Sequence, residues 1–580
     1  MPKTFRSNFS FGGVMAESDP LLPAAYWDNG DYEAIASPAD PRCFVIGRTG
    51  SGKSAVFQHL EEQHAGHVIR ILPEDLALPY IVNLDVMRQL RALDVHVDPF
   101  LIALWKHVIL VEVLRFRYQI KSLEEKQNVL TTLRQLVGRD PRRLKAVDYL
   151  NEFGDRFWSE TDERVKQVAE SFERKINAAA DVHANTPIVG GKGSTSIEQQ
   201  SKKEVRQDVA ARYQKIVNDS QLARLNDMIT MLDAEILRER EPFLYLLIDD
   251  LDKEWVPSDL SNLLIRCLFR AVIDMKRVKR LKILVALRTN IFQELDYAAE
   301  GSGGQEEKVR GLALHMRWTR NDLRSLLESR AQAASQAYRM QPPMVLADML
   351  PRTTKGDGHP VEYVLDRTLM RPRDAIAFMN EAVRLASGHN RITWTMLHLA
   401  EKTFSEERLL ALRDEWKAPY RDIDKVLLQF RDKPASMTKP ELALVLDDVA
   451  MLIGDAAFKG RAWMEPMFRL LWAPGSQEIT WEETYGPIVD LLYNISFLGI
   501  AAGPHAKPSY SYEGTSPQRA TAELMESTVF KIHPMFSRGL EVKAPGRGTR
   551  DAGRSNVRRV TERAVQPRLA LAPVRPATPD

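Results

Sequence analysis

Eight consecutive residues have the types and spacing of a phosphate-binding loop. A glycine, four further residues, a second glycine, a lysine and a serine lie between an apolar run and a helical pattern, as such a loop requires. The glycines allow successive backbone N–H groups to point at phosphate oxygens, and the following helix adds the positive end of its dipole. We expect a nucleotide to bind to Gly47, Arg48, Thr49, Gly50, Ser51, Gly52, Lys53 and Ser54.

Two side chains of this segment have roles of their own in the expected site. Lys53 is expected to reach the β and γ phosphates of ATP and to assist catalysis, and the Ser54 hydroxyl is expected to bind Mg²⁺. ATP and Mg²⁺ are therefore the expected cofactors. The alternative is a chance glycine turn that only joins a strand to a helix.

Two neighbouring aspartates, Asp249 and Asp250, directly follow a second apolar run at residues 243–248. Phosphoryl transfer needs a carboxylate for the metal and a group that orients water, usually at the end of a neighbouring buried strand. We expect Asp249 to bind the metal. Asp250, turned to the other face by strand alternation, is expected to position or deprotonate the attacking water. Alone, such a pair is equally typical of a solvated turn.

Arg288 and Arg373 are the arginines expected to act on the γ phosphate. Arg288 follows the apolar run 282–287, and a side chain from a strand between the two previous strands would contact the γ phosphate or the water. Arg373 lies in the first turn of a later helix, where an arginine would report the γ phosphate to a lid. Each also has a structural explanation, a salt-bridged strand end for Arg288 and a charged helix cap for Arg373.

These side chains must be positioned by the elements around them, and the apolar runs are typical of buried strands. Helical patterns separate the runs, which predicts repeated βα units with helices on both faces of a parallel sheet. A charged, helix-favouring segment at residues 121–240 interrupts this layout and is expected to form a helical hairpin. The expected strands are residues 43–46, 67–72, 243–248, 282–287 and, on a weaker pattern, 311–316.

The C-terminal half is mainly helical. Residues 319–416 follow helical patterns throughout and are interpreted as a lid. From about residue 420, helices precede a glycine-punctuated, aromatic-rich end that is typical of a small hairpin. Beyond Lys543 the chain is rich in Arg and Pro and has no apolar period, so disorder is expected.

The predicted fold class is therefore α/β: a P-loop NTPase parallel sheet of about five strands, with a helical insert, a helical lid and a C-terminal winged-helix-like domain. The expected domains are the ATPase core at 1–120 and 241–318, the helical insertion at 121–240, the lid at 319–417, the winged-helix-like domain at 418–540 and the disordered basic tail at 541–580.

Composition limits the function classes. The chain has 580 residues, a formal net charge of +2 and two cysteines, which excludes a single small module, a disulfide framework and a thiolate zinc site. The first residues lack the apolar core of a secretory signal, and the apolar stretches are too short or too charged to span a bilayer. A cytoplasmic protein without a membrane partner is expected. The twelve histidines show no metal-ligand spacing, so no metal beyond Mg²⁺ is proposed.

Taken together, four segments resemble the additional-strand P-loop ATPases of the STAND and KAP-like type. They are residues 47–54, the Asp-Asp-Leu-Asp signature within 247–253, residues 286–290 and residues 371–374. The chain is also similar to a bacterial group of uncharacterised ATPases in that class, over residues 10–540. The resemblance implies a five-stranded sheet, Asp252 as a third acidic position near the site, and a winged-helix region after the lid.

Some features depart from this class. Nearly two hundred residues separate Lys53 from Asp249, which is more than usual, and the membrane helices that KAP-type members often carry in such an insert are absent. No leucine-rich, WD40 or TPR-like array follows. Target recognition is therefore expected in the insert, the C-terminal domain or a separate effector protein. A homo-oligomer is also expected, in which Arg277 or Arg280 would complete a neighbour's site.

Three functions are compatible with these features. The leading hypothesis is a signalling or defence-type ATPase, in which nucleotide binding and hydrolysis move the lid and the C-terminal domain between two arrangements. The second is a DNA-associated ATPase that resembles replication initiators and binds nucleic acid through the winged-helix-like domain and the tail. The third keeps the nucleotide as a structural switch with negligible turnover. The tail would neutralise nucleic-acid phosphates through Arg547, Arg550, Arg554, Arg558, Arg559, Arg563 and Arg568.

Overall fold

The computed structural model describes part of the chain. Asp252, most of the expected insertion at 121–240 and the tail arginines lie outside the described residues. The described residues are 4–72, 97–118, 145, 148–149, 222–238, 242–251, 258–295, 305–472, 480–503, 505–513 and 526–543.

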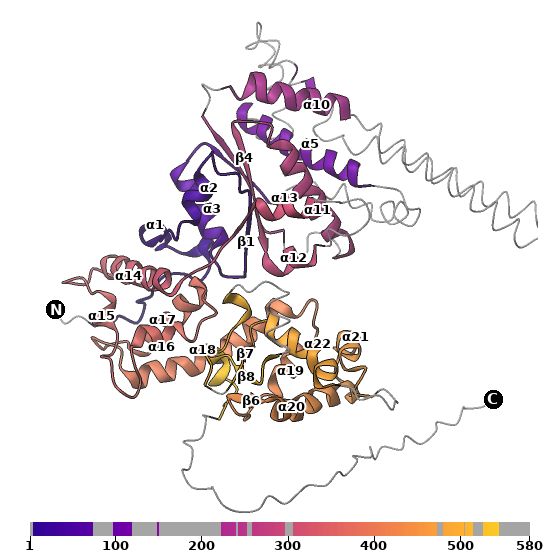
Figure 1. Cartoon of the computed structure of the whole chain (residues 1–580). Helices are drawn as coiled ribbons and strands as arrows, with labels where there is room; N and C mark the ends of the chain where they lie inside the picture. The colour runs from indigo at the N-terminus through magenta and orange to yellow at the C-terminus, as the bar shows by residue number, and fades with distance from the viewer. Residues whose placement is uncertain are drawn as a thin grey trace, which may run out of the picture.

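Five parallel strands form the larger sheet (Figure 1). They are β1 (Phe44–Gly47), β2 (Val68–Ile71), β3 (Leu244–Ile248), β4 (Leu281–Arg288) and β5 (Ala313–His315). All five apolar runs predicted as strands are confirmed. The strand order is β2-β3-β4-β1-β5. β4 therefore lies between β1, which leads into the glycine turn, and β3, which leads to the paired aspartates.

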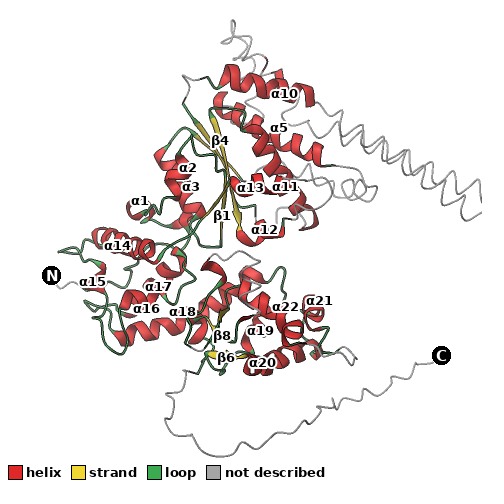
Figure 2. Ribbon diagram, in the orientation of Figure 1, coloured by secondary structure: helices red, strands yellow, loops and turns green. Residues whose placement is uncertain are grey.

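Alternate side chains along the strands face two helical layers, which Figure 2 shows on either side of the sheet. One layer contains α2 (Asp31–Ala36) and α3 (Lys53–Gln63), and the other contains α5 (Asp98–Tyr118) and α11 (Ser258–Met275). On β3, Tyr245 and Leu247 pack with Phe57 of α3, whereas Leu246 and Ile248 belong to the cluster of α5 and α11. This period of two is the geometry of an extended strand, and it assigns each strand residue to one face.

Shorter elements complete this part of the structure. Before β1, the chain forms η1 (Ala16–Ser18) and α1 (Leu22–Ala25). On the side of α5 and α11 it forms α10 (Leu222–Met231) and the π-helical turn η3 (Leu232–Ile236). Two helices lie between β4 and β5 in the chain: α12 (Thr289–Glu294) directly follows β4, and α13 (Gln305–Gly311) precedes β5.

A helical unit follows β5 at the position expected for the lid. Its helices are α14 (Arg320–Ala337), α15 (Leu346–Met349), α16 (Pro360–Leu365), α17 (Pro372–Leu385) and α18 (Trp394–Trp416). A capping box formed by Thr319 and Asp322 begins α14. Phe5, Phe9 and Phe11 lie in the hydrophobic cluster of these helices. The first residues of the chain therefore pack against the lid, although they precede the sheet in sequence.

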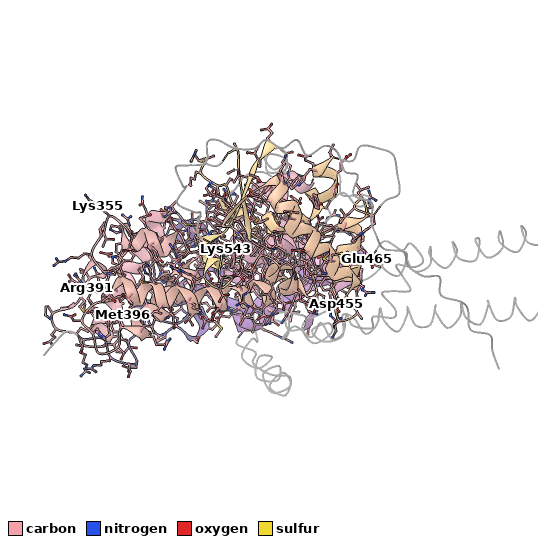
Figure 3. The ribbon with its side chains drawn as sticks, turned by 90° about the horizontal axis from the view of Figure 1, so that it is seen from below. Lys355, Arg391, Met396, Asp455, Glu465 and Lys543 are labelled. Carbon is pink, nitrogen blue, oxygen red and sulfur yellow. The ribbon has the colours of Figure 1, made fainter. Side chains whose placement is uncertain are left out.

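The last described unit combines helices with a small antiparallel sheet of order β6-β8-β7. It contains α19 (Ile423–Leu428), β6 (Ser436–Thr438), α20 (Lys439–Met451), η4 (Leu452–Gly454), α21 (Arg461–Met464), η5 (Glu465–Phe468), α22 (Trp481–Asn494), β7 (Leu498–Ala501), η6 (Ser511–Glu513), β8 (Val529–Ile532) and α24 (Pro534–Ser537). Helices followed by the antiparallel strand pair β7 and β8 are thus present. This unit and the lid share one hydrophobic cluster. Figure 3 shows Lys355 and Arg391 of the lid at one end of the molecule, and Asp455 and Glu465 at the other.

None of the described helices is both long and apolar enough to cross a membrane. The long apolar helix α5 instead lies in the core, where Trp105 and Leu110 are buried and the indole N–H of Trp105 donates to the carbonyl of Leu264 at 3.0 Å. Packing against α11 and the sheet therefore explains its apolar character.

Candidate nucleotide-binding site

The glycine turn joins the end of β1 to the start of α3, and its shape requires glycine. Gly50 has a φ of 79° and Gly52 a φ of 101°, values that residues with a Cβ atom rarely adopt. A Cβ atom on Gly50 would lie 2.7 Å from Cβ of Arg373, so the turn also touches the lid closely. The wrapped backbone leads directly into the first turn of α3, whose N–H groups lack partners within the helix.

Lys53, the first residue of α3, folds its side chain back over the turn. Its Nζ donates to the carbonyl of Gly47 at 2.8 Å and to that of Arg48 at 3.1 Å. Main-chain carbonyls of the turn therefore hold the ammonium group beside the start of the helix. An anion bound in the turn would find this charge already in place.

Ser54, in the first turn of α3, contacts Asp249, which directly follows β3. The Ser54 hydroxyl donates a hydrogen bond of 3.2 Å to Oδ2 of Asp249, and Asp249 is only 4% exposed. Burial is the largest influence on the pKa of Asp249 and raises it, while the hydrogen bond from the Asp250 N–H and the charge of Arg70 oppose the rise. A buried carboxylate beside a hydroxyl is the kind of oxygen pair that Mg²⁺ prefers. The donor set therefore fits the expected metal.

Asp250 lies beside this pair in an unusual backbone conformation. β3 ends at Ile248, and Asp250 has a φ of 61°. The strand alternation that was expected to orient its side chain therefore does not extend to it. Asp250 is half-buried, which leaves it more open to solvent than Asp249.

Arg288 lies at the same end of the sheet. It is the last residue of β4 and is paired in register with Gly47, the last residue of β1. Leu284 and Ala286 of β4 pack in the cluster of α3, so the period of two assigns Arg288 to that face as well. The topology thus brings the end of β4 between the glycine turn and the aspartates.

The lid contacts the turn through the beginning of α17. Nη1 of Arg371 donates to the carbonyl of Thr49 at 3.0 Å, while Nε of the same guanidinium donates to Asp374 at 2.9 Å. Burial opposes the charged form of Arg371, but Asp374 and Glu415 outweigh it and raise the pKa. Arg373, the residue selected from the sequence, donates its main-chain N–H to the carbonyl of Gly50 at 3.4 Å and its Nε to the carbonyl of Val14 at 3.2 Å.

Arg48 projects from the turn toward the C-terminal unit. Its Cζ lies 5.9 Å from the ring centroid of Tyr512. Both Nη1 and Nη2 are inaccessible and, within the part of the chain that the structure describes, have no hydrogen-bond partner. Burial lowers the pKa of Arg48 to about 10, and the nearby charge of Arg371 adds to this. This residue of the expected loop therefore faces the protein.

The sequence did not single out two further residues that contact the site. Arg70 of β2 donates from Nη2 to Oδ2 of Asp249 at 3.2 Å. Trp318, just after β5, donates its indole N–H to the carbonyl of Ser51 at 2.8 Å. Arg70 had a signal, because it is a single charge within the apolar run 67–72. Trp318 had none, since its partner lies far away in sequence.

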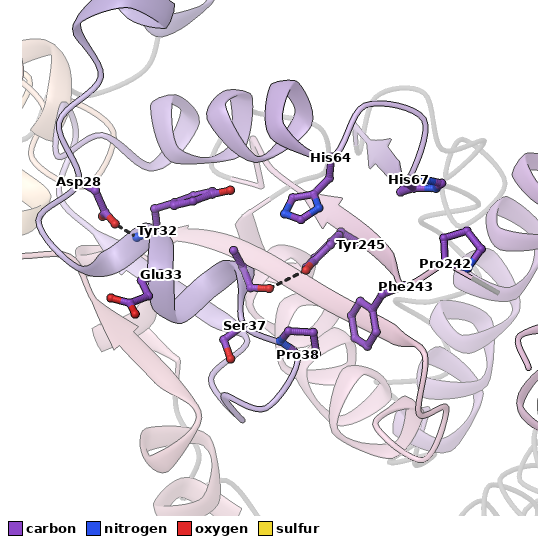
Figure 4. Close-up of a pocket in the computed structure, with 11 residues that line it drawn as sticks. Asp28, Tyr32, Glu33, Ser37, Pro38, His64, His67, Pro242, Phe243 and Tyr245 are labelled. Atoms are coloured by element: carbon purple, nitrogen blue, oxygen red, sulfur yellow. Dashed lines mark hydrogen bonds between the residues drawn. The ribbon is translucent and has the colours of Figure 1, made fainter. Parts of the chain in front are cut away.

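A separate pocket of about 740 Å³ lies at the other end of the sheet (Figure 4). Its walls include Tyr245, near the start of β3, and His64, just after α3, and the Tyr245 hydroxyl donates to the carbonyl of Ala36 at 2.5 Å. Asp249 follows the opposite end of β3, so this pocket is distinct from the candidate site. Among the described side chains, no group of three or more His, Cys, Asp or Glu could hold a metal ion.

Comparisons with known proteins give a local match and a distant relative. Residues 321–413 match a family model described as the FunZ-associated C-terminal helical domain. Over 553 residues the chain is 22% identical to the "Putative transposon gamma-delta 80.3 kDa protein" of Escherichia coli (strain K12), which covers 93% of this chain and 68% of that protein. The family match falls on α14 to α18, so the helical unit that contacts the glycine turn has a counterpart among known domains.

Proposed function

We propose that this protein is a P-loop ATPase that binds MgATP and acts as a nucleotide-driven signalling or defence-type switch in the cytoplasm. One observation carries the proposal: the Ser54 hydroxyl donates to Asp249 at 3.2 Å. These are the two side chains that the sequence assigned to the metal, and they come from segments nearly two hundred residues apart. A functionless glycine turn would give no reason for a buried carboxylate at this position.

Each residue has a defined part in this proposal. The amides of the turn and Lys53 bind the triphosphate, and Ser54 and Asp249 would hold the metal. Mg²⁺, when bound, supplies positive charge to the phosphate oxygens. Asp250 orients the attacking water or accepts its proton. Arg288 stabilises charge on the γ phosphate, which its place in register with Gly47 supports.

The topology supports the finer assignment to the STAND and KAP-like class of additional-strand ATPases. The additional strand of the proposal is β4, which separates β1 from β3. The order of helix α19, strand β6, helices α20 and α22, and strands β7 and β8 supports a winged-helix-like domain after the lid. Under this assignment the chain forms homo-oligomers and acts on an effector protein.

The contacts of the turn support a switch. Arg371 of the lid holds the carbonyl of Thr49, and Arg48 lies against Tyr512 of the C-terminal unit. A turn that rearranges around phosphates would change both contacts. In this proposal, the contacts that differ between the two states would lie at residues 48 and 49.

Phosphate release in a single turnover tests the enzymatic assignment. With enzyme in excess over ATP, the wild-type protein should release phosphate, and Asp250→Asn should slow the release by about a hundredfold while still binding nucleotide. Asp227→Asn is the matched control, since Asp227 is exposed on α10 and should behave as wild type. Full activity of Asp250→Asn would remove its catalytic role. Binding without release by the wild type would favour the non-enzymatic switch.

The relative named after a transposon favours a second candidate function, in which the ATPase acts on DNA. The described structure argues against a groove contact by α22, the helix that precedes the β7–β8 hairpin. It carries Glu482, Glu483 and Asp490 and no Lys or Arg, so DNA phosphates would repel it. DNA binding would then depend on the tail. Removing residues 541–580 should abolish any salt-dependent DNA affinity, and unchanged affinity would exclude the tail as the contact.

Catalysis across subunits is a further part of the proposal with its own test. Arg277 donates to Asn226 at 3.2 Å, and Arg280 lies over the ring of Phe243. Arg280 directly precedes β4, at the opposite end of the strand from Arg288. If Arg277 or Arg280 contacts the glycine turn of a neighbouring subunit, that subunit must therefore approach the end of the sheet where β4 begins. Mixing a variant lacking both with Lys53→Ala should restore activity if they act across subunits.

A further inference from the structure

Asp249 already has a cationic partner in the protein itself. Nη2 of Arg70 lies 3.2 Å from Oδ2 of Asp249, with side-chain exposures of 27% and 5%. Arg70 is paired in register with Leu247, and Leu247 packs on the α3 face of the sheet. Asp249 lies two residues after Leu247, so the alternation of side chains assigns it to the same face of the sheet. Its contact with Arg70 then follows from the pairing of β2 with β3.

Three donors already contact the carboxylate of Asp249, two of them at Oδ2. Oδ1 accepts the main-chain N–H of Asp250 at 2.9 Å, and Oδ2 accepts both Ser54 Oγ and Arg70 Nη2 at 3.2 Å each. A metal held by Ser54 and Asp249 would have to bind at the same oxygen, Oδ2 of Asp249. Arg70 and the metal therefore compete for one oxygen, and either of them supplies the positive charge that a buried carboxylate requires.

Arg70 has a second acceptor close by. Nη1 lies 3.4 Å from Oε2 of Glu61, a residue of α3 that follows the glycine turn. Burial raises the pKa of Glu61, and the charge of Arg70 lowers it. The guanidinium bridges two carboxylates, so it can give up Asp249 without losing every partner.

We infer that Arg70 is the resident counter-ion of Asp249, which occupies the metal's electrostatic position in the nucleotide-free protein and passes to Glu61 when the metal–nucleotide complex binds. This inference rests on the proposed function, because it presupposes that Ser54 and Asp249 bind the metal. Arg70 is a positioning residue here. It sets how much Mg²⁺ the site requires, and it supplies the positive charge beside the buried carboxylate when no metal is bound.

The Mg²⁺ dependence of nucleotide binding tests the inference. Titrating Mg²⁺ into protein and a fluorescent non-hydrolysable ATP analogue gives the half-saturating Mg²⁺ concentration. Arg70→Gln removes the competitor and should lower that concentration roughly tenfold. Arg70→Lys keeps the charge but cannot bridge Asp249 and Glu61 in the same way, so a smaller decrease is expected. Arg42→Gln is the matched control, since it removes another Arg–Asp pair of 2.6 Å with Asp40.

A second readout needs no nucleotide. Arg70→Gln should melt at a lower temperature than wild type in the absence of divalent metal, and millimolar Mg²⁺ should restore most of the difference, whereas Mg²⁺ should not rescue Arg42→Gln. An unchanged or higher Mg²⁺ requirement in Arg70→Gln, with normal analogue binding by the wild type, overturns the inference and leaves the proposed function standing. Failure of the wild type to bind the analogue overturns the proposed function instead. If Arg70→Gln does not fold, Arg70→Lys decides by the same criterion.

Discussion

The guanidinium of Arg371 donates a hydrogen bond of 3.0 Å to the main-chain carbonyl of Thr49, which ties the first turn of α17 to the glycine turn after β1. The same guanidinium contacts Asp374 at 2.9 Å and Glu415 at 3.2 Å. Arg48 precedes Thr49 in the chain, and its Nη atoms have no hydrogen-bond partner among the described residues. Buried Arg371 and half-buried Arg48 thus differ in how far their charge is compensated.

This difference predicts unequal effects of the two arginines on stability. Arg371→Met leaves Glu415 without its ion-pair partner. Among the described residues, Asp374 keeps only the more distant Arg408 as an ion-pair partner, at 3.5 Å. We therefore expect Arg371→Met to cost about 3 to 5 kcal/mol of unfolding free energy. Arg48→Met removes a guanidinium that lacks acceptors, and we expect a change within about 1 kcal/mol in either direction. Thermal unfolding followed by circular dichroism compares the two. Equal losses would show that the ion pairs of Arg371 do not stabilise the lid.

The contact between Gly50 and the lid predicts a second pair of variants. Gly50 and Gly66 both have a φ of 79°, but only at Gly50 would a Cβ atom meet the stem of Arg373. Both Gly→Ala changes should cost about 1 to 2 kcal/mol from the left-handed backbone. Gly50→Ala should in addition displace Arg373 and weaken ATP binding, whereas Gly66→Ala should bind ATP normally. Calorimetric titration with ATP measures the difference, and equal affinities would contradict it.

His533 predicts a pH dependence of stability. It is 1% exposed, and burial lowers its pKa to about 3 from an ordinary value of 6.5. The unfolded chain therefore binds a proton below about pH 6.5 that the native state refuses, so stability falls as the pH decreases. Between pH 7.5 and 5.5 this residue should account for about 1.4 kcal/mol. His533→Gln should lose that part of the pH dependence.

The control for this prediction is His389→Gln, since His389 is exposed. It should show the same change of melting temperature between pH 7.5 and 5.5 as the wild type. A His533→Gln protein with an unchanged pH dependence would show that protonation of His533 is not coupled to unfolding.

The sequence predicted what local pattern determines. Five apolar runs became the five strands, and three of them, β1, β3 and β4, are buried almost throughout, which a continuous apolar run predicts. The glycine turn and Asp249 were located because each follows such a run directly. The helices of residues 319–416 were likewise predicted, because their patterns depend on residue types within a few positions of each other.

The sequence could not show which distant side chains meet. Arg70 contacts Asp249 because β2 pairs with β3, and nothing in the chain order specifies that pairing. The sequence selected Arg373 as the lid arginine near the nucleotide, but it could not show that the guanidinium of Arg371 also donates to the turn, at the carbonyl of Thr49. This contact depends on how the start of α17 packs on the turn. Arg48 and Tyr512 are adjacent only through the packing of the C-terminal unit.

The most direct test of the central claim is calorimetric titration of a non-hydrolysable ATP analogue with and without Mg²⁺. Wild type should bind, and Mg²⁺ should tighten the binding. Lys53→Ala should lose at least about tenfold in affinity under both conditions, and Asp249→Asn should lose only the gain from Mg²⁺. Lys355→Ala, at an exposed position on the periphery of the lid (Figure 3), should match wild type. Full affinity in Lys53→Ala together with an unchanged Mg²⁺ effect in Asp249→Asn would contradict the account.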